Sequence, residues 1–369
     1  MPPKPPSYFP SIDILRGFAA LSVVAYHVIV HFAWKDFPIE GPLVWFRIGW
    51  MGVDLFFVIS GFVIGLSAFA EIDKHGTSAF RKPFFQRRLS RIVPLHYFTV
   101  LIFVAMVVPQ VLFENFWLNA VTHLLFLHNL FPAFHGAING SNWSLGTEMQ
   151  FYVLMLVLAP WLLRTAGWKV LCALLLTAWA WRYGCTLILP VVGDQDSNRL
   201  FMASTQLPGT LDEFVAGLLL AKLLRSQRAV GTLLRWPLVP IALAIVATWG
   251  VLTLFWRFTY WDIPFMVVFY KSLLAGAFFF VVMAACALGS PRWVMLTAPL
   301  RYLGTISYGI YLWHLPVLLT LRDLPWLTPQ RALPLVVLLT LCLAAASWHF
   351  FEQPFIKRFQ RPVNPDLRT

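Results

Sequence analysis

The chain has few charged residues: Asp, Glu, Lys and Arg make up 12% of its 369 residues. An average soluble domain has about 25%. Hydrophobic residues reach 59%, and long apolar runs recur from residue 11 almost to the C-terminus. This composition excludes an ordinary soluble domain and predicts an all-α polytopic membrane protein.

Cysteine is also scarce. The four cysteines, at positions 172, 185, 286 and 342, all lie in apolar runs without metal-ligand spacing. They predict thiols facing lipid or core, and neither a disulfide nor a metal site. The opening MPPKPPSYFPSID lacks a small-residue cleavage site, so we expect the first apolar helix itself to be the targeting signal.

Acidic residues are outnumbered by basic ones, 16 to 28, which gives a net charge of +12. A nucleic-acid partner is one explanation of such an excess. In a membrane protein, however, basic residues collect in the cytoplasmic loops. We therefore expect no nucleic acid and a bacterial cytoplasmic (inner) membrane location.

Eleven apolar runs come close to the ~20 residues that a membrane-crossing helix needs. They are 11–32, 48–70, 91–112, 117–134, 144–163, 168–190, 205–224, 237–256, 264–288, 300–321 and 331–352. The run 117–134 is short and contains His123, His128 and Asn129. If it is re-entrant or interfacial, about ten helices cross and most basic residues fall on the cytoplasmic side with both termini.

This topology divides the chain into three parts. Residues 1–10 are expected to form an N-terminal cytoplasmic tail, 11–355 the transmembrane domain and 356–369 a basic cytoplasmic tail. Within the transmembrane part, burying a titratable side chain costs free energy, so each such residue needs a structural or functional explanation. Many of them are predicted at one depth, in the outer half of the bilayer or near its middle: His27, Asp54, Glu148, Arg182, Asp212, Glu213, Lys271 and His314. Such a set either locks the bundle by ion pairs or lines a water-accessible cavity, and we favour the cavity.

His27 is the predicted general base of such a cavity, because an imidazole can accept and return a proton near neutral pH. A nearby carboxylate would fix its tautomer. Asp54 matches His27 in depth and Glu148 is the alternative. The alternative to a catalytic role is a structural histidine that only forms hydrogen bonds between helices.

Arg16 is predicted at the cytoplasmic mouth, where it could bind phosphates or extend to lipid headgroups. The stretch FFQRRLSRIVP (84–94) adds Arg87, Arg88 and Arg91. Arg88 and Arg91 are three residues apart and share a helix face, which suits a phosphate clamp. An ordinary cytoplasmic basic cluster would need no ligand.

At this point the sequence resembles the acyltransferase-3 family of membrane-bound bacterial O-acyltransferases. Six motifs in the family's order carry the resemblance over more than 300 residues: RGFAALSVVAYH (16–27), GVDLFFVISGFVIG (52–65), RRLSRIVP (87–94), NWSLGTEMQFY (142–152), ISYGIYLWHLPV (306–317) and FEQPF (351–355). The resemblance implies a ten-helix domain that moves an acyl group, commonly acetyl, from cytoplasmic acyl-CoA to a sugar hydroxyl.

By position, the resemblance gives Arg16 and His27 the family's essential pair. It gives Arg88 and Arg91 a donor-binding role and Glu148 that of a functional carboxylate. Acyl-CoA is then a substrate, with no permanently bound cofactor. Further candidates follow from the motifs: Ser60 could stabilise an oxyanion or allow close helix packing, Asn142 and Trp143 suit contacts with a sugar, and His314 could bind substrate or join a network with Tyr308 or Tyr311.

Many relatives carry an additional extracytoplasmic esterase-like domain. Because this chain ends soon after Glu352, we expect it to act alone or to pass its acyl group to a separate extracytoplasmic partner. The acceptor is expected to belong to a surface or secreted glycan, although the sequence does not name it. A polytopic transporter without acyl transfer is the main alternative, because buried charges and a broken helix also suit alternating access.

Overall fold

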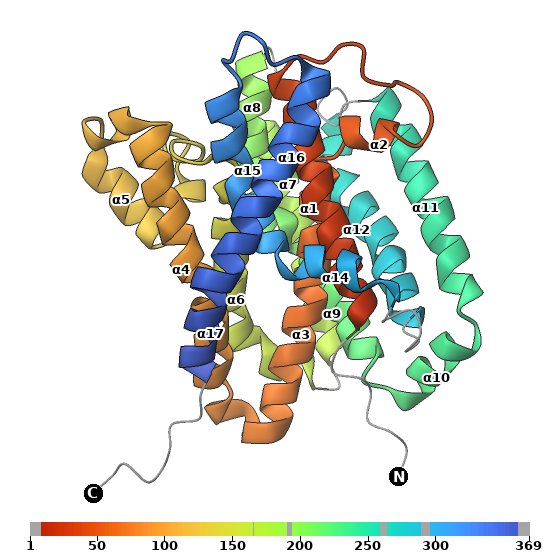
Figure 1. Cartoon of the computed structure of the whole chain (residues 1–369). Coiled ribbons are helices and arrows are strands. Elements are labelled where there is room, and N and C mark those ends of the chain that lie inside the picture. The colour runs from red at the N-terminus through yellow and green to blue at the C-terminus, as the bar shows by residue number, and fades with distance from the viewer. Residues whose placement is uncertain (1–8, 165, 190–193, 259–263, 289–295, 361–369) are drawn as a thin grey trace, which may run out of the picture.

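The computed structural model describes residues 9–164, 166–189, 194–258, 264–288 and 296–360 (Figure 1). These residues form helices and connecting loops, and none of them belongs to a β-strand. The helices are α1 (Pro10–His31), α2 (Val44–Arg47), α3 (Met51–Ala79), α4 (Arg81–Met106), α5 (Phe116–Leu124), α6 (Trp143–Leu162), α7 (Gly167–Ile188), α8 (Asp194–Ser204), α9 (Leu211–Leu223), α10 (Gln227–Arg235), α11 (Leu238–Arg257), α12 (Pro264–Ala287), α14 (Ala298–Thr305), α15 (Ser307–Leu321), α16 (Pro329–Ser347) and α17 (Gln353–Gln360).

Eight helical stretches in the described residues are long and apolar enough to cross a membrane. They contain α1, α3, α4, α6, α7, α11, α12 and the continuous stretch from α16 to α17. This confirms the predicted all-α polytopic membrane fold. The count of ten crossings stays a prediction, because the two other expected spans are interrupted: 205–224 contains a 3₁₀ turn (Leu207–Thr210) before α9, and 300–321 divides into α14 and α15.

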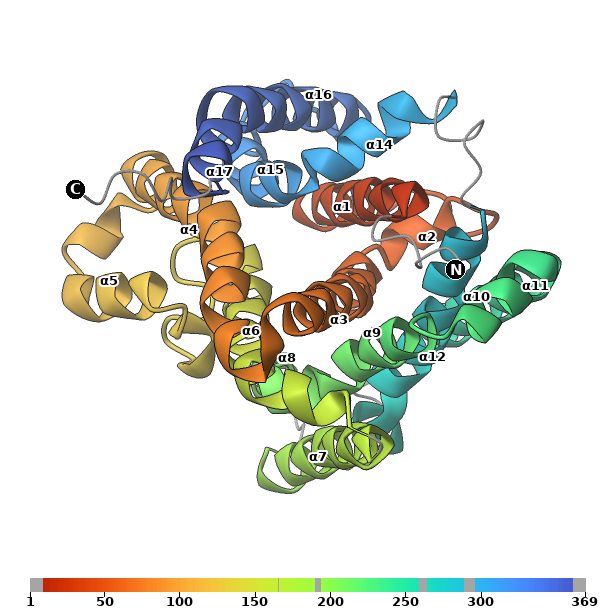
Figure 2. The ribbon, with the colours of Figure 1, turned by 90° about the horizontal axis from the view of Figure 1, so that it is seen from below.

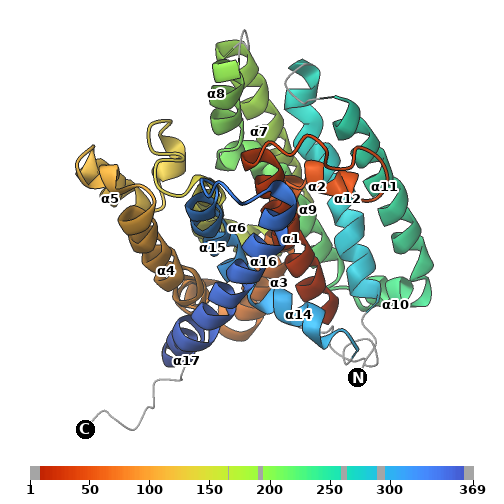
Figure 3. The ribbon, with the colours of Figure 1, turned by 45° about the horizontal axis from the view of Figure 1, so that its top comes forward.

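The segment 117–134 is not a continuous helix. It contains most of α5, which has nine residues, and a 3₁₀ turn at His128–Leu130. Nine residues rise only about 13 Å, less than half of the hydrocarbon thickness. Figures 1 and 3 show α5 at the edge of the bundle, beside α4. The segment therefore does not cross as a single helix, which agrees with its predicted re-entrant or interfacial nature.

The elements that carry the basic clusters lie at one end of the molecule. The beginning of α1, the junction of α3 with α4, α10 and α17 are all at the lower end of Figure 1. This end is the expected cytoplasmic face. The predicted tails fall mostly on residues 1–8 and 361–369, which are outside the described residues, as is Arg292.

Helix α3 occupies the centre of the bundle and packs against α1, α4, α6, α9 and α12 (Figure 2). Its contact with α9 is close because both helices present glycine. A Cβ atom on Gly61 would meet the backbone of Phe214, and one on Gly217 would meet the backbone of Val58 and Phe62. Small residues let helix backbones approach in membranes. Ser60, next to Gly61 on the same helix, contacts Glu148 of α6 at the cavity described below.

Candidate active site

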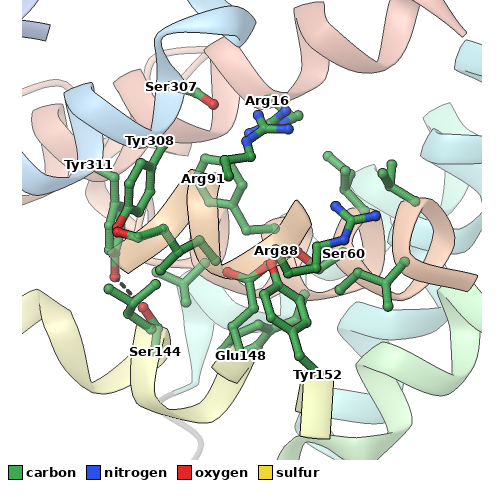
Figure 4. A pocket seen from close by; sticks show the side chains of 18 residues that line it. Arg16, Ser60, Arg88, Arg91, Ser144, Glu148, Tyr152, Ser307, Tyr308 and Tyr311 are labelled. Carbon is green, nitrogen blue, oxygen red and sulfur yellow. Dashed lines mark hydrogen bonds between the residues drawn. The ribbon is translucent and has the colours of Figure 1, made fainter. Parts of the chain in front are cut away.

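The candidate site is a cavity between α1, α3, α4, α6 and α15. It contains about 830 Å³ of space free of protein atoms, its open mouth included. Figure 4 shows its polar lining, which comes from residues far apart in sequence. These are Arg16, Ser60, Arg88, Arg91, Ser144, Glu148, Tyr152, Ser307, Tyr308 and Tyr311. The remaining lining residues are apolar. The cavity therefore combines an apolar wall with a few polar groups, as ligand pockets commonly do.

The cavity has an excess of positive charge. Arg16, Arg88 and Arg91 supply three guanidinium groups, and Glu148 supplies the one carboxylate of the lining. Arg88 lies over two aromatic rings, 5.8 Å from the centroid of Phe84 and 5.9 Å from that of Tyr152. Neither Arg88 nor Arg91 forms a salt bridge within the described part of the chain. Both guanidinium groups therefore line the cavity without a salt bridge in this part of the chain, which suits the binding of an anion.

Arg87 does not share this environment. Although it is adjacent to Arg88 in sequence, one helical step turns it about 100° away. Its guanidinium forms an ion pair with Glu71 of α3 instead. Arg87 therefore does not line the cavity with Arg88 and Arg91, contrary to their predicted grouping, while the predicted shared face of Arg88 and Arg91 is confirmed.

The carboxylate of Glu148 is oriented by two hydroxyl groups. Ser60 Oγ donates to Glu148 Oε1 at 2.7 Å, and Tyr152 Oη donates to the same oxygen at 2.8 Å. Tyr152 lies four residues after Glu148 on α6, which places both on one helix face. Because both donors use Oε1, Oε2 accepts no hydrogen bond from the described residues. Ser60 thus acts on Glu148, while the close packing expected of its motif is provided by Gly61.

His27 lies outside the lining of this cavity, in contact with His314 of α15. His27 Nδ1 is 3.0 Å from the carbonyl oxygen of Val23 and 3.2 Å from His314 Nε2. His314 Nδ1 is 2.6 Å from the carbonyl oxygen of Tyr311. Among the residues that the structure describes, His27 thus has no carboxylate partner of the kind that we expected. His314 does contact Tyr311, which agrees with the predicted alternative of a network with Tyr308 or Tyr311.

Asp54 is engaged in a buried ion-pair triad, so its predicted pairing with His27 is wrong. Lys271 Nζ of α12 lies 2.5 Å from Asp54 Oδ1 and 3.1 Å from Glu213 Oε1 of α9. All three side chains are at most 3% exposed. A buried carboxylate needs a compensating charge, and Lys271 meets this need where His27 does not. Glu148, the alternative partner, is held by Ser60 and Tyr152.

Arg182 and Asp212 form a second buried pair, between α7 and α9. Arg182 Nη2 donates to Asp212 Oδ2 at 2.6 Å, and Arg182 Nη1 donates to Asp212 Oδ1 at 3.1 Å. Ser272 Oγ also donates to Asp212 Oδ2, at 2.5 Å. The expectation of one shared polar cavity is therefore wrong for these charges. They are structural ion pairs, apart from the arginine-lined cavity and from the histidine pair.

Asn142 and Trp143 are buried, 0% and 9% exposed, and do not form the expected open sugar-binding mouth. The carbonyl oxygen of Asn142 accepts a hydrogen bond from His128 Nε2 at 2.9 Å. Trp143 stacks on His135, with ring centroids 5.9 Å apart and an interplanar angle of 13°. Burial, with a smaller contribution from the nearby His128, lowers the pKa of His135 to about 4, so this ring is neutral at pH 7. The start of α6 thus packs against the 128–139 loop.

His123 and His128 belong to a buried cluster in this loop region. Their rings stack with centroids 4.4 Å apart and an interplanar angle of 6°. No group of three or more His, Cys, Asp or Glu in the described ranges is arranged to hold a metal ion. Each ring donates to a backbone carbonyl of its own region, Asn119 for His123 and Asn142 for His128. These histidines therefore connect the loop to α5, to the start of α6 and, through His96, to α4.

The sequence reasoning missed Tyr152 as a functional candidate and named Tyr308 and Tyr311 only as possible network partners of His314. Tyr152 could have been found from its spacing of four residues to Glu148 in the motif NWSLGTEMQFY. Tyr308 and Tyr311 follow from the same rule, three residues apart on α15. The hydroxyl of Tyr308 donates to the carbonyl oxygen of Ile92 at 2.7 Å, and that of Tyr311 donates to the carbonyl oxygen of Ser141 at 2.8 Å. Only the tertiary structure shows that the three rings line one cavity.

Comparison with known proteins places these features in a family. The sequence profile of a family described as "Acyltransferase domain" matches residues 9–349. A peptidoglycan O-acetyltransferase (OatA) of Listeria monocytogenes is 30% identical over 379 aligned residues, which cover 95% of this chain and 56% of that protein. An O-acetyltransferase (OatA) of Staphylococcus aureus is 25% identical, over 96% of this chain and 58% of its own length. The chain thus spans about half the length of these relatives. No solved structure matches it significantly.

Proposed function

The chain belongs to the acyltransferase family that matches residues 9–349, and from that premise we propose that it transfers an acyl group, acetyl in the first instance, from acyl-CoA to a sugar hydroxyl of a surface or secreted glycan. The observation that carries the donor assignment is the set of three guanidinium groups around one cavity, two of them without a carboxylate partner. Family membership favours this enzyme over the transporter alternative.

The arginine-lined cavity is proposed to bind the phosphates of acyl-CoA. Arginine suits this task because its planar group donates two parallel hydrogen bonds to a phosphate. Arg16 reaches the cavity from α1, and Arg88 and Arg91 reach it from one face of α4. The apolar wall of the same cavity, including Phe56 and Val63, suits the uncharged part of the donor.

His27 is proposed as the general base for the acceptor hydroxyl. It removes the hydroxyl proton while the oxygen attacks the thioester carbonyl carbon. The tetrahedral intermediate then breaks its carbon–sulfur bond, and the CoA thiolate takes the proton from the imidazolium of His27. Products are the O-acyl sugar and free CoA, so atoms and protons balance. Glu148, held by Ser60 and Tyr152, is proposed to orient the donor or acceptor through its second oxygen.

The proposal that the acceptor is a glycan rests on the relatives, because the relative from Listeria monocytogenes is named for acting on peptidoglycan. A separate extracytoplasmic partner that receives the acyl group stays part of the proposal. The proposed location is the bacterial cytoplasmic membrane.

The test compares a bacterial strain lacking this gene with the same strain carrying wild type or His27→Ala. Mass spectrometry of surface and secreted glycans measures acyl esters, and a tag on each protein measures its amount in the membrane. We expect wild type to restore an ester and His27→Ala to fall to the level of the empty strain at equal abundance. His75→Ala, an exposed histidine of α3, serves as control. Equal esters with His27→Ala would refute the proposed base, and no ester with wild type would refute a glycan acceptor.

A further inference from the structure

The contacts of the histidine pair determine which ring nitrogen carries each proton. His314 is fully buried, and its Nδ1 lies 2.6 Å from the carbonyl oxygen of Tyr311. A carbonyl oxygen can only accept a hydrogen bond, so Nδ1 of His314 carries the hydrogen. In the neutral ring the other nitrogen, Nε2, then has a lone pair and can only accept.

The same argument fixes His27. Its Nδ1 faces two acceptors, the carbonyl oxygen of Val23 at 3.0 Å and the lone pair of His314 Nε2 at 3.2 Å. Both contacts require a hydrogen on His27 Nδ1. The neutral ring therefore has its lone pair on Nε2, which receives no hydrogen bond from the described residues. The nitrogen left free is the one that can take a proton from a substrate.

We propose that His314 is the positioning residue of His27, and that Nε2 of His27 is the basic atom of the acyl transfer. This inference rests on the proposed function, in which His27 is the general base. His314 then takes the place that a carboxylate occupies in a catalytic triad: it accepts the Nδ1 hydrogen and fixes the plane of the ring. Unlike a carboxylate, it adds no negative charge to the membrane interior.

Helix α15 connects this pair to the arginine-lined cavity. Tyr311 lines the cavity, and its hydroxyl hydrogen-bonds to Ser144 at 2.7 Å and to the carbonyl oxygen of Ser141 at 2.8 Å. The backbone carbonyl of the same residue holds His314. Tyr311, which lines the proposed donor site, and His314, which contacts His27, are therefore three residues apart on the same helix.

The first test measures the tautomer without depending on activity. The protein is labelled with ¹⁵N-histidine, reconstituted in bilayers at a pH where His27 is neutral, and studied by solid-state NMR. The signals of His27 are identified by their loss in His27→Ala. We expect a protonated Nδ1 and an unprotonated Nε2 for His27 in the wild type. A hydrogen on Nε2 of His27 would overturn the inference, whatever the enzyme acts on.

The second test measures acetyl transfer by His314→Leu and His314→Gln at equal protein amount. General acid–base catalysis contributes roughly 10²–10⁴-fold, and loss of its support should remove part of that. We expect about a 10-fold lower kcat for the leucine variant with an unchanged KM for acetyl-CoA. Glutamine, whose amide oxygen can accept the Nδ1 hydrogen of His27, should restore most of the rate. His75→Leu is the matched control.

The outcomes separate the two proposals. An inactive His27→Ala together with a fully active His314→Leu overturns the positioning role alone. A raised KM for acetyl-CoA with unchanged kcat in His314→Leu also overturns it, because the residue would then serve the donor site. A fully active His27→Ala overturns the proposed base and the positioning role together, while the NMR result still decides the tautomer.

Discussion

The arginines at the beginning of α4 show how a single helical step separates two roles. Arg87 pairs with Glu71, whereas Arg88 and Arg91 line the cavity without a salt bridge in the described part of the chain. Adjacent residues on a helix point about 100° apart, and residues separated by three point in similar directions. The same cluster thus contains one arginine in an ion pair and two that line the cavity.

This difference gives a prediction for donor binding. Arg88→Gln and Arg91→Gln should each raise the KM for acetyl-CoA about 10-fold or more, because each removes a charge-assisted hydrogen bond worth about 1.5–3 kcal/mol. Arg87→Gln is the matched control on the same helix and should leave this KM unchanged. Steady-state kinetics of the purified protein in detergent measures all three. An equal rise for Arg87→Gln would mean that the cluster acts only through its overall charge.

At the scale of elements, the packing of α3 against α9 decides where the polar groups of α3 lie. Gly61 and Gly217 let the two backbones come together, and a Cβ atom at either position would meet the backbone of the other helix. One consequence is the buried triad, in which Glu213 of α9 shares Lys271 with Asp54 of α3. Another is that Ser60 lies within 2.7 Å of Glu148 on α6.

A larger side chain in this contact should therefore destabilise the bundle. Gly217→Val should cost about 1–3 kcal/mol, because overpacking forces the helix backbones apart. Gly250→Val on α11 is the control, since a Cβ at Gly250 meets no atom within 4 Å. Thermal unfolding of the two purified variants in the same detergent measures the difference. Equal melting temperatures would show that α3 and α9 can separate without loss of stability.

At the scale of the whole molecule, the basic elements share one end while the loop before α2 lies at the other (Figure 1). The lower end contains the α3–α4 junction, α10 and α17. An excess of Lys and Arg marks the cytoplasmic side of a membrane protein. The orientation also bears on the proposed function, because acyl-CoA, the proposed donor, is available only from the cytoplasm.

Cysteine labelling tests this orientation. In a variant whose four native cysteines are replaced by alanine, Glu40→Cys and Ser226→Cys each introduce one thiol at an exposed position. We expect a membrane-impermeant maleimide to label Glu40→Cys on intact cells. Ser226→Cys, next to α10, should react only after the cells are permeabilised. Labelling of both positions from outside would contradict the proposed topology.

The sequence by itself determined the class of the protein and several of the side chains that line the cavity. Long apolar runs can only be satisfied as helices in a bilayer, and this predicted the polytopic fold. Spacing along one helix is local information, so the shared face of Arg88 and Arg91 could be predicted from the sequence. The motifs likewise indicated the family to which the chain belongs.

Tertiary structure decided which side chains meet between helices. Asp54 and His27 were predicted at one depth, but depth along a span says nothing about rotation around the helix axis. The rotation of α3 and its packing on α9 bring Asp54 to Lys271, while α15 brings His314 to His27. Trp143 is buried by the loop that folds over it, which no periodic pattern encodes. Contacts between segments more than a hundred residues apart depend on helix rotation and on neighbours, and only the folded bundle fixes both.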